Sequence, residues 1–336
     1  MPKIIMAKFF ILVCVFLAPI KGRSQDIHFS QFYHSSLFTN PANTGVFDGR
    51  YRISTNYRNQ WQSINKPYKT VFTSFDMKFP SKKLGLGLSF FNDKAGKSKM
   101  GITQGNLLVS YNLSINGSNH FITGIQYGFG QKSISFENLK WDSQFNGNTY
   151  NPDTPSGENQ ASDSYTYMDV SAGVLWNYIA SPSRPKFKAS AGLAIFHANQ
   201  PNQSFIGNDK LYFKIVSHIN NQFKIPDREI YFLPQLLYAI QGPQSEINIG
   251  TLVKFVLLTE GNDLIRINRV ERKNSYSYAL VGAQLRYKDA LIVMAAFEFK
   301  KGLLLSFSYD VNISKLNVAS RYKGGMELAL SYRGYF

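Results

Sequence analysis

Long segments in which apolar and polar residues alternate one by one recur along the whole of this chain. In TYMDVSAGVLWNY, residues 166–178, Met168, Val170 and Val174 share one face, and Tyr167, Asp169 and Ser171 lie on the other. Such alternation is typical of a β-strand with one apolar face. Few stretches carry the 3.6-residue stripe of a helix, so the pattern predicts an all-β fold.

We predict fourteen strands, and many of them contain ten or more residues. Strands of soluble sheets usually have about five or six residues, whereas a strand tilted across a bilayer needs about 9–11. A closed barrel lets strands satisfy their backbone polar groups inside lipid. The sequence therefore predicts a transmembrane antiparallel β-barrel over 50–336, rather than a soluble sandwich or propeller. The predicted strands are 50–61, 68–79, 84–92, 102–115, 119–132, 165–179, 186–198, 211–224, 229–241, 245–258, 276–287, 290–300, 302–313 and 324–336.

Residues 1–24 are predicted to be a secretory signal peptide. Two lysines precede the apolar run FFILVCVFLA, which is too short to span a bilayer as a helix. We place the cleavage near Ser24 or Gln25. A secretory signal followed by a barrel predicts a protein of the bacterial outer membrane.

Charge and cysteine content exclude several classes of function. The formal net charge is +16, and removal of 1–24 takes away four cations and no acidic residue, which leaves +12. Such a balance can indicate nucleic acid, but a secreted barrel argues for no nucleic acid and for cations near anionic lipid headgroups. Cys14 is the only cysteine, so the mature chain has no disulfide and no zinc–cysteine site.

The predicted loops suggest an orientation in which both termini are periplasmic. The loops after odd-numbered strands are then extracellular, and the longest of them, 133–164, is rich in Asn, Asp, Ser, Pro and Gly. The stretch 259–275 disagrees, because periplasmic turns are usually short. Either the strand count is wrong near 199–225, or this turn is a contact surface.

No pattern in the chain predicts a catalytic, cofactor-binding or metal site. The histidines are scattered, and no HExxH or GxSxG motif is present. Barrel lipases can lack GxSxG, so an outer-membrane hydrolase is unsupported rather than excluded. The glycines of LGLGLS, 84–89, are interpreted as thin positions of the wall, because no helix follows them as a phosphate loop requires. The five histidines are His28, His34, His120, His197 and His218.

A charged cluster is predicted inside the barrel, at the seam between the first and last strands. Arg50, Arg52 and Arg58 share one face of the first strand, and a charge on the lipid face would cost a few kcal/mol. Antiparallel closure places Arg58 near Glu327, with Asp310 on the neighbouring strand. We interpret this lumenal cluster as structural.

The segment 25–49 precedes the first strand and lacks its alternation. Asn40-Pro41 and Asn43-Thr44-Gly45 are turn sequences. Its aromatic residues need a cover, so we predict a plug in the barrel mouth or a docking element for a periplasmic partner.

Several of these stretches resemble the PorP/SprF family of the Bacteroidetes type IX secretion system. The resemblance extends over nearly all of the mature chain. Its most specific parts are the N-terminal stretch 29–45 and the two stretches near the C-terminus, 307–316 and 324–333. The matching stretches are FSQFYHSSLFTNPANTG (29–45), FHANQPNQSF (196–205), LPQLLYAIQGPQSEINIG (233–250), FSYDVNISKL (307–316) and GGMELALSYR (324–333).

The resemblance implies an outer-membrane barrel that is not an enzyme and has no cofactor. Family members associate with periplasmic ring and peptidoglycan-binding components of the secretion machine, and some support export of a large adhesin, including gliding adhesins. The resemblance also points to Phe29, Gln31, Asn40, Pro41 and Gly45 as part of the docking or plug element. The alternative function is an outer-membrane transporter of hydrophobic small molecules, of the fatty-acid-channel type, which would need an open lumen with an apolar pocket.

The last strand is predicted to carry a signal for the barrel assembly machinery. Tyr332 and Phe336 are its aromatic residues at the C-terminal end, and a terminal aromatic strand resembles the signal that this machinery reads. The predicted lipid-facing residues of the strand are Met326, Leu328, Leu330, Tyr332, Gly334 and Phe336.

Overall fold

The fold was analysed in a computed structural model of the chain. The residues that the structure describes are 26–60, 68–96, 100–135, 140–157, 164–180, 186–205, 209–257, 277–299, 302–315 and 317–335. The predicted signal peptide, the stretch 259–275 and Phe336 lie outside these residues.

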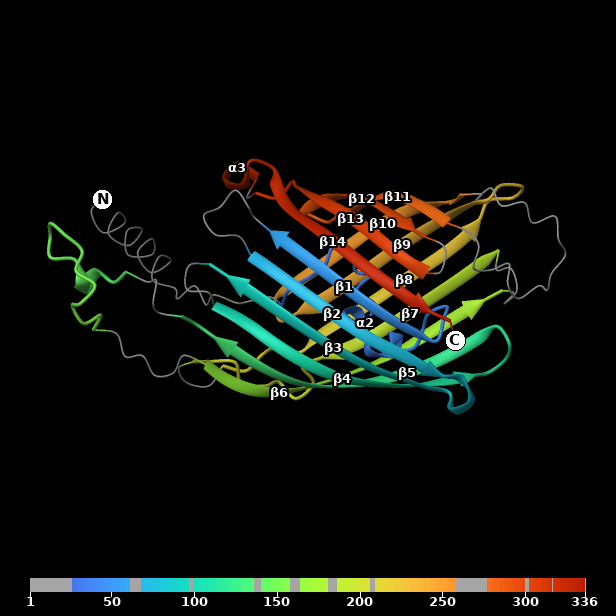
Figure 1. The fold of residues 1–336 in the computed structure, drawn as a ribbon, viewed down its shortest axis with the longest axis horizontal. Coiled ribbons are helices and arrows are strands. Elements are labelled where there is room, and N and C mark those ends of the chain that lie inside the picture. The colour runs from blue at the N-terminus through green and yellow to red at the C-terminus, as the bar shows by residue number, and fades with distance from the viewer. Residues whose placement is uncertain are drawn as a thin grey trace, which may run out of the picture.

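Fourteen antiparallel strands close into one barrel, in which each strand pairs with its neighbours in the sequence and β1 pairs with β14 (Figure 1). The predicted all-β, fourteen-strand antiparallel barrel is thereby confirmed. The strands are β1 Tyr51–Gln60, β2 Tyr68–Phe79, β3 Leu84–Ala95, β4 Met100–Ser114, β5 Asn119–Ser133, β6 Ser164–Ile179, β7 Phe187–Phe196, β8 Lys214–Lys224, β9 Ile230–Gln241, β10 Gln244–Leu257, β11 Ser277–Arg286, β12 Ala290–Glu298, β13 Leu303–Asn312 and β14 Lys323–Gly334.

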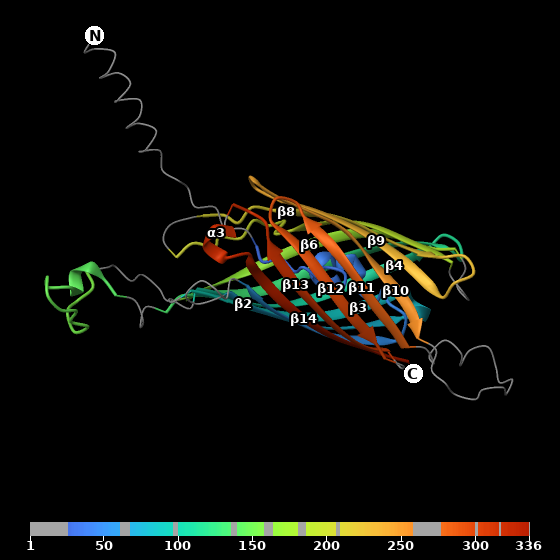
Figure 2. The same ribbon diagram turned by 90° about the horizontal axis from the view of Figure 1, so that it is seen from above.

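Short helical turns interrupt the connections and the segment before β1. Helix α2 (Ser36–Thr39) and the 3₁₀ turn η1 (Pro41–Asn43) precede β1, and both lie inside the ring of strands (Figures 1 and 2). The others are η2 (Pro80–Lys82), η3 (Asp142–Gln144) and α3 (Asn317–Ser320). Among the described residues, no helix is long and apolar enough to cross a membrane.

The predicted strand boundaries differ from the observed ones by up to three residues. At β8 the prediction began at 211, but the backbone N–H of Leu211 donates to the carbonyl of Pro201 in the preceding loop. Residues 211–213 are therefore held by the loop and join the sheet only at Lys214.

The alternation places one face of each strand toward lipid and the other toward the lumen. On β14, Leu328, Leu330 and Tyr332 are 38–49% exposed, whereas Glu327 and Ala329 are almost fully buried. The predicted lipid face of this strand is therefore present over 328–332. Across the seam, Arg58 pairs directly with Glu327 in the register.

The two mouths of the barrel differ in their connections. One mouth, here called the loop mouth, carries the connection that includes 140–157 and α3; the other, the turn mouth, carries η2 and the end of β14 (Figure 1). Asp26 lies at the loop mouth, because its N–H donates to Gln241 at the end of β9. Gly334 pairs with Tyr51 at the turn mouth.

The expectation that both termini lie on the periplasmic side is therefore corrected. The described residues nearest the two termini, Asp26 and Tyr335, lie at opposite mouths. The reason is that the segment before β1 runs through the lumen from one mouth to the other, whereas the sequence predicted that it packs in the barrel mouth or against a periplasmic partner.

Candidate functional site

Residues 26–49, here called the plug, run the length of the barrel interior before they enter β1. The plug begins at the loop mouth and reaches the turn mouth at Gly49, where the N–H of Arg50 donates to the carbonyl of Gly334 at 2.7 Å. It contacts the wall at four levels, which are described in order from the loop mouth. Its position inside a closed barrel makes it the candidate functional element.

At the first level, Asp26 is held by ion pairs. Asp26, Asp169, His197 and Lys214 are here called the latch. Its carboxylate lies 2.7 Å from Nε2 of His197 and 3.8 Å from Nζ of Lys214. His197 follows β7 directly, and its Nδ1 lies 3.0 Å from Asp169 of β6. A histidine between two carboxylates is favoured in its charged form.

The protonation of this latch is set by its charges rather than by burial. Burial alone would lower the pKa of His197, but Asp26 and Asp169 outweigh it and raise that pKa to about 10. Burial alone would raise the pKa of Asp26, but His197 and Lys214 hold it well below its usual range. Asp26 and His197 are therefore both charged at neutral pH.

At the second level, the plug binds the seam strands through the backbone of Ser30 and Gln31. Their N–H groups donate to the two carboxylate oxygens of Glu327 at 2.8 and 3.1 Å. The Ser30 hydroxyl donates to Asp310 at 2.7 Å. Arg58 forms ion pairs with Asp310 at 2.8 Å and with Glu327 at 3.1 Å.

A second guanidinium completes this group. Nη1 of Arg286, on β11, lies 3.1 Å from Asp310, and its Nη2 donates to the Ser30 hydroxyl at 2.7 Å. Arg58, Arg286, Asp310 and Glu327, here called the seam node, are 0–3% exposed. Two cations and two anions balance one another, as buried charges require.

At the third level, Asn40 fixes the middle of the plug. Its Oδ1 accepts the N–H of Ala42 and so caps η1, and its Nδ2 donates to the carbonyls of Val174 and Leu193 on β6 and β7. The wall can lie this close to Asn40 only where it carries no side chain. A Cβ on Gly173 would lie 2.0 Å from Asn40 Oδ1.

At the fourth level, the end of the plug passes over β2–β4. The Gly45 N–H donates to Asp76, which also accepts two hydrogen bonds from Arg52. Gly45 has a φ of +74°, a conformation that favours glycine. A Cβ on Gly85 would lie 2.6 Å from the carbonyl of Thr44. The glycines of 84–89 therefore include a thin position of the wall that admits the plug.

Apolar contacts seal the plug between these polar levels. Phe29 packs with Leu37 of the plug and with Phe72 and Leu108 of the wall, all of them at most 3% exposed. Phe32 packs with wall residues of β7, β8 and β9, which are Ala194, Phe196, Val216, Leu237 and Ala239.

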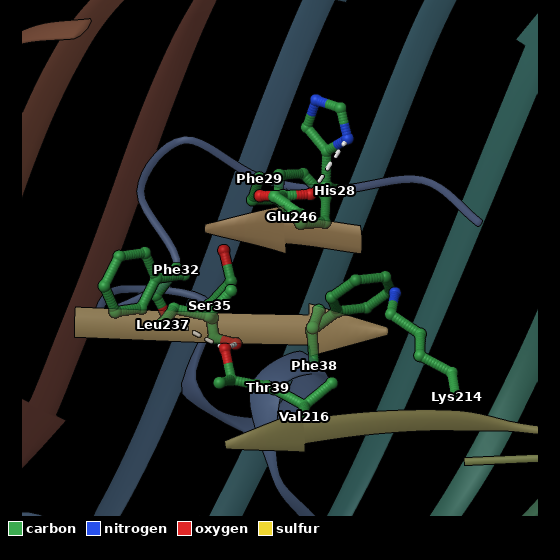
Figure 3. A pocket seen from close by; sticks show the side chains of 11 residues that line it. His28, Phe29, Phe32, Ser35, Phe38, Thr39, Lys214, Val216, Leu237 and Glu246 are labelled. Atoms are coloured by element: carbon green, nitrogen blue, oxygen red, sulfur yellow. Dashed lines mark hydrogen bonds and ion pairs between the residues drawn. The ribbon is translucent and has the colours of Figure 1, made fainter. Parts of the chain in front are cut away.

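A small pocket remains between the plug and strands β8–β10 (Figure 3). It has a volume of about 40 Å³ and is lined by Phe29, Phe32 and Phe38 of the plug. Drug-sized ligands need about 300–1,000 Å³, so this pocket has room for a few water molecules only. Within it, the buried hydroxyl of Ser35 has no hydrogen-bond partner among the described residues.

The structure brings together the residues that the sequence singled out. Arg58, Asp310 and Glu327 meet at the seam node. Arg52 faces the lumen against Asp76, whereas Arg50 is exposed and precedes β1. The five proposed docking or plug residues all lie on the plug with contacts to the interior: Phe29, Gln31, Asn40, Pro41 and Gly45. This geometry suits the plug alternative.

Sequence reasoning missed the latch and Arg286. His197 lies in the stretch FHANQPNQSF, which carried part of the family resemblance, but its partners Asp26 and Asp169 are 171 and 28 residues away. No local spacing reveals such a group. In the described part of the chain, no group of three or more histidine, cysteine or acidic side chains could hold a metal ion.

Comparison with known proteins identifies the family. The family model of the type IX secretion system membrane protein PorP/SprF matches residues 21–332. The chain belongs to this PorP/SprF family. Together with the closed barrel and its apolar outer face, membership makes the chain an outer-membrane protein of a secretion system. No curated protein sequence matches the chain.

Solved structures with a similar fold are distant in sequence. The Ralstonia pickettii toluene transporter TbuX and the P. putida toluene transporter TodX each have a TM-score of 0.48, with 9% and 8% identity, over 90% of this chain and 94% of theirs. BamA from Haemophilus ducreyi, lacking POTRA domains 1–3, has a TM-score of 0.40 at 11% identity, over 85% of this chain and 70% of its own.

Proposed function

We propose that this PorP/SprF protein is a non-enzymatic anchor, which holds type IX secretion machinery at the outer membrane and supports export of a large surface protein such as an adhesin. The observation that carries the proposal is the plug. It occupies the lumen from mouth to mouth and is bound at four levels. A barrel filled in this way has its outer wall for lipid and its two mouths for partners.

The turn mouth is the proposed face for periplasmic ring and peptidoglycan-binding components. Its turns are short where the structure describes them, as on the periplasmic side of outer-membrane barrels, and the loop mouth carries the longer connections. Lys82, the last residue of η2, and Lys83, which follows it, are exposed at the turn mouth. They are available to acidic partners.

The competing function, transport of hydrophobic small molecules, requires an open lumen and an apolar pocket of adequate size. The lumen instead contains the plug, and the pocket beside it has a volume of about 40 Å³. The wall around the plug is rich in buried polar residues, including Asn56, Asn106 and Gln126. These features favour the anchor over the transporter.

Affinity purification of the tagged chain from outer membranes tests the proposal. We expect ring and peptidoglycan-binding components to co-purify, and expect K82E/K83E to reduce their recovery several-fold. The matched control is K315E/K323E, which reverses two exposed lysines at the loop mouth and should leave recovery unchanged. Purification of the wild-type chain alone, with bound hydrophobic small molecules, would support the transporter instead.

A further inference from the structure

We propose that the plug is a template for barrel closure: it docks on the wall before the seam between β1 and β14 forms, and the seam node couples the two events. The proposal concerns assembly and is independent of which partners the finished barrel binds.

The first support is the position of the plug across the seam. The plug contacts β13 through Asp310 and β14 through Glu327, and the same two carboxylates bind Arg58 on β1. Ser30 therefore lies between β1 on one side of the seam and β13 and β14 on the other. One group of side chains serves both the plug and the seam.

The second support is the chemistry of the node without the plug. Glu327 is completely buried and accepts two backbone N–H groups from the plug. Buried charges that lose such donors are strongly destabilised. A seam that closed first would enclose two carboxylates and two guanidiniums with an incomplete set of partners. Closure around a docked plug avoids this state.

The third support is topological. The plug runs from mouth to mouth, and one narrow passage lies between Asn40 and the wall at Gly173, where an added Cβ would lie 2.0 Å from Asn40 Oδ1. After closure, the chain before Asn40 would have to thread through this passage. Before closure, the same segment can be laid onto an open sheet from the side.

The mature chain contains no cysteine, so engineered pairs report each event separately. The Oγ atoms of Ser54 and Ser331 lie 2.8 Å apart across the seam, and S54C/S331C reports closure. A Cβ on Gly87 would lie 3.1 Å from Cγ2 of Thr44, and T44C/G87C reports docking of the plug away from the node. Each pair is placed in the full mature chain, which is refolded into lipid vesicles under oxidising conditions.

We expect the 44–87 cross-link to form before the 54–331 cross-link, or together with it. Glu327→Gln in the S54C/S331C background should slow the seam cross-link by about tenfold. The matched variant is Glu298→Gln, which removes a lumenal carboxylate that pairs with Arg333 and Lys254; it should leave the rate near that of the parent.

Two results would overturn the template. One is a seam cross-link that is complete while the 44–87 pair is still reduced. The other is an equal effect of Glu327→Gln and Glu298→Gln on seam closure. The heat-dependent shift of the folded barrel on SDS gels confirms that each variant reaches the closed state, so that a slower rate is distinguished from a failure to fold.

Discussion

At the residue scale, the most informative groups are charges that the plug shares with the wall. Removal of one partner from a buried ion pair usually costs about 3–5 kcal/mol, because the other charge stays buried. Glu327 and Asp310 each have partners from both the plug and β1. Their substitution therefore affects two interfaces at once.

The latch predicts a specific dependence on pH. The pKa of His197 is raised from 6.5 to about 10. Its contribution to the stability of the docked plug end is therefore complete below pH 6.5 and is lost as the pH rises toward 10. The pKa of Asp26 is lowered, so the contribution of Asp26 to the stability of the docked plug end is present above pH 3.8 and is lost at acidic pH. Between pH 6.5 and 10, the population with a released plug end should rise by up to about tenfold for each pH unit.

A spin label on the variant Ile27→Cys checks this prediction. The label should be more mobile at pH 10 than at pH 6. In the His197→Gln background, where the titrating group is gone, the mobility should not change over this range. Equal mobility of the label at both pH values with His197 present would contradict the assigned role of the latch.

At the element scale, the plug and the wall are matched through glycines that face the lumen. Gly173→Ala places a methyl group against Asn40, and we expect it to destabilise the barrel by about 1–3 kcal/mol, as overpacking does. Gly105→Ala is the matched change on β4, where an added Cβ meets no atom within 4 Å. Thermal unfolding in detergent measures both; equal midpoints would show that the plug does not press on Gly173.

The closing strand carries a second prediction at this scale. Tyr332 faces lipid and packs near Tyr51 across the seam, with ring centroids 6.1 Å apart. Deletion of Phe336 should impair insertion of the barrel into outer membranes, because the aromatic end is the proposed assembly signal. Phe336→Tyr, which keeps an aromatic ring, should insert. Normal insertion of the variant that lacks Phe336 would contradict the proposed role of the aromatic end as an assembly signal.

At the scale of the whole molecule, a filled barrel should not conduct ions. Wild-type protein in planar bilayers is expected to show no steady conductance, because the plug closes the lumen along its length. Gly173→Val, which forces the plug away from β6, should produce intermittent openings. Stepwise conductance from the wild-type protein would favour a channel over an anchor.

The sequence by itself determined the barrel. Alternation with period two reports which face of a strand meets lipid, and this local property was sufficient for the number of strands and for placing Arg58 near Glu327; the exact register of the seam came from the structure. The same local rule located the lumenal carboxylates, because a charge on the lipid face would be costly.

Only the tertiary structure decided the course of the plug. Its turns and aromatic residues predicted a packed segment. They did not predict that this segment crosses the lumen and that Asp26 and Tyr335 lie at opposite mouths. The latch joins Asp26 to His197, 171 positions away, and to Lys214, 188 positions away. Arg286 meets Ser30 across 256 positions. Contacts of this kind depend on closure of the whole sheet, and no pattern of neighbouring residues encodes them.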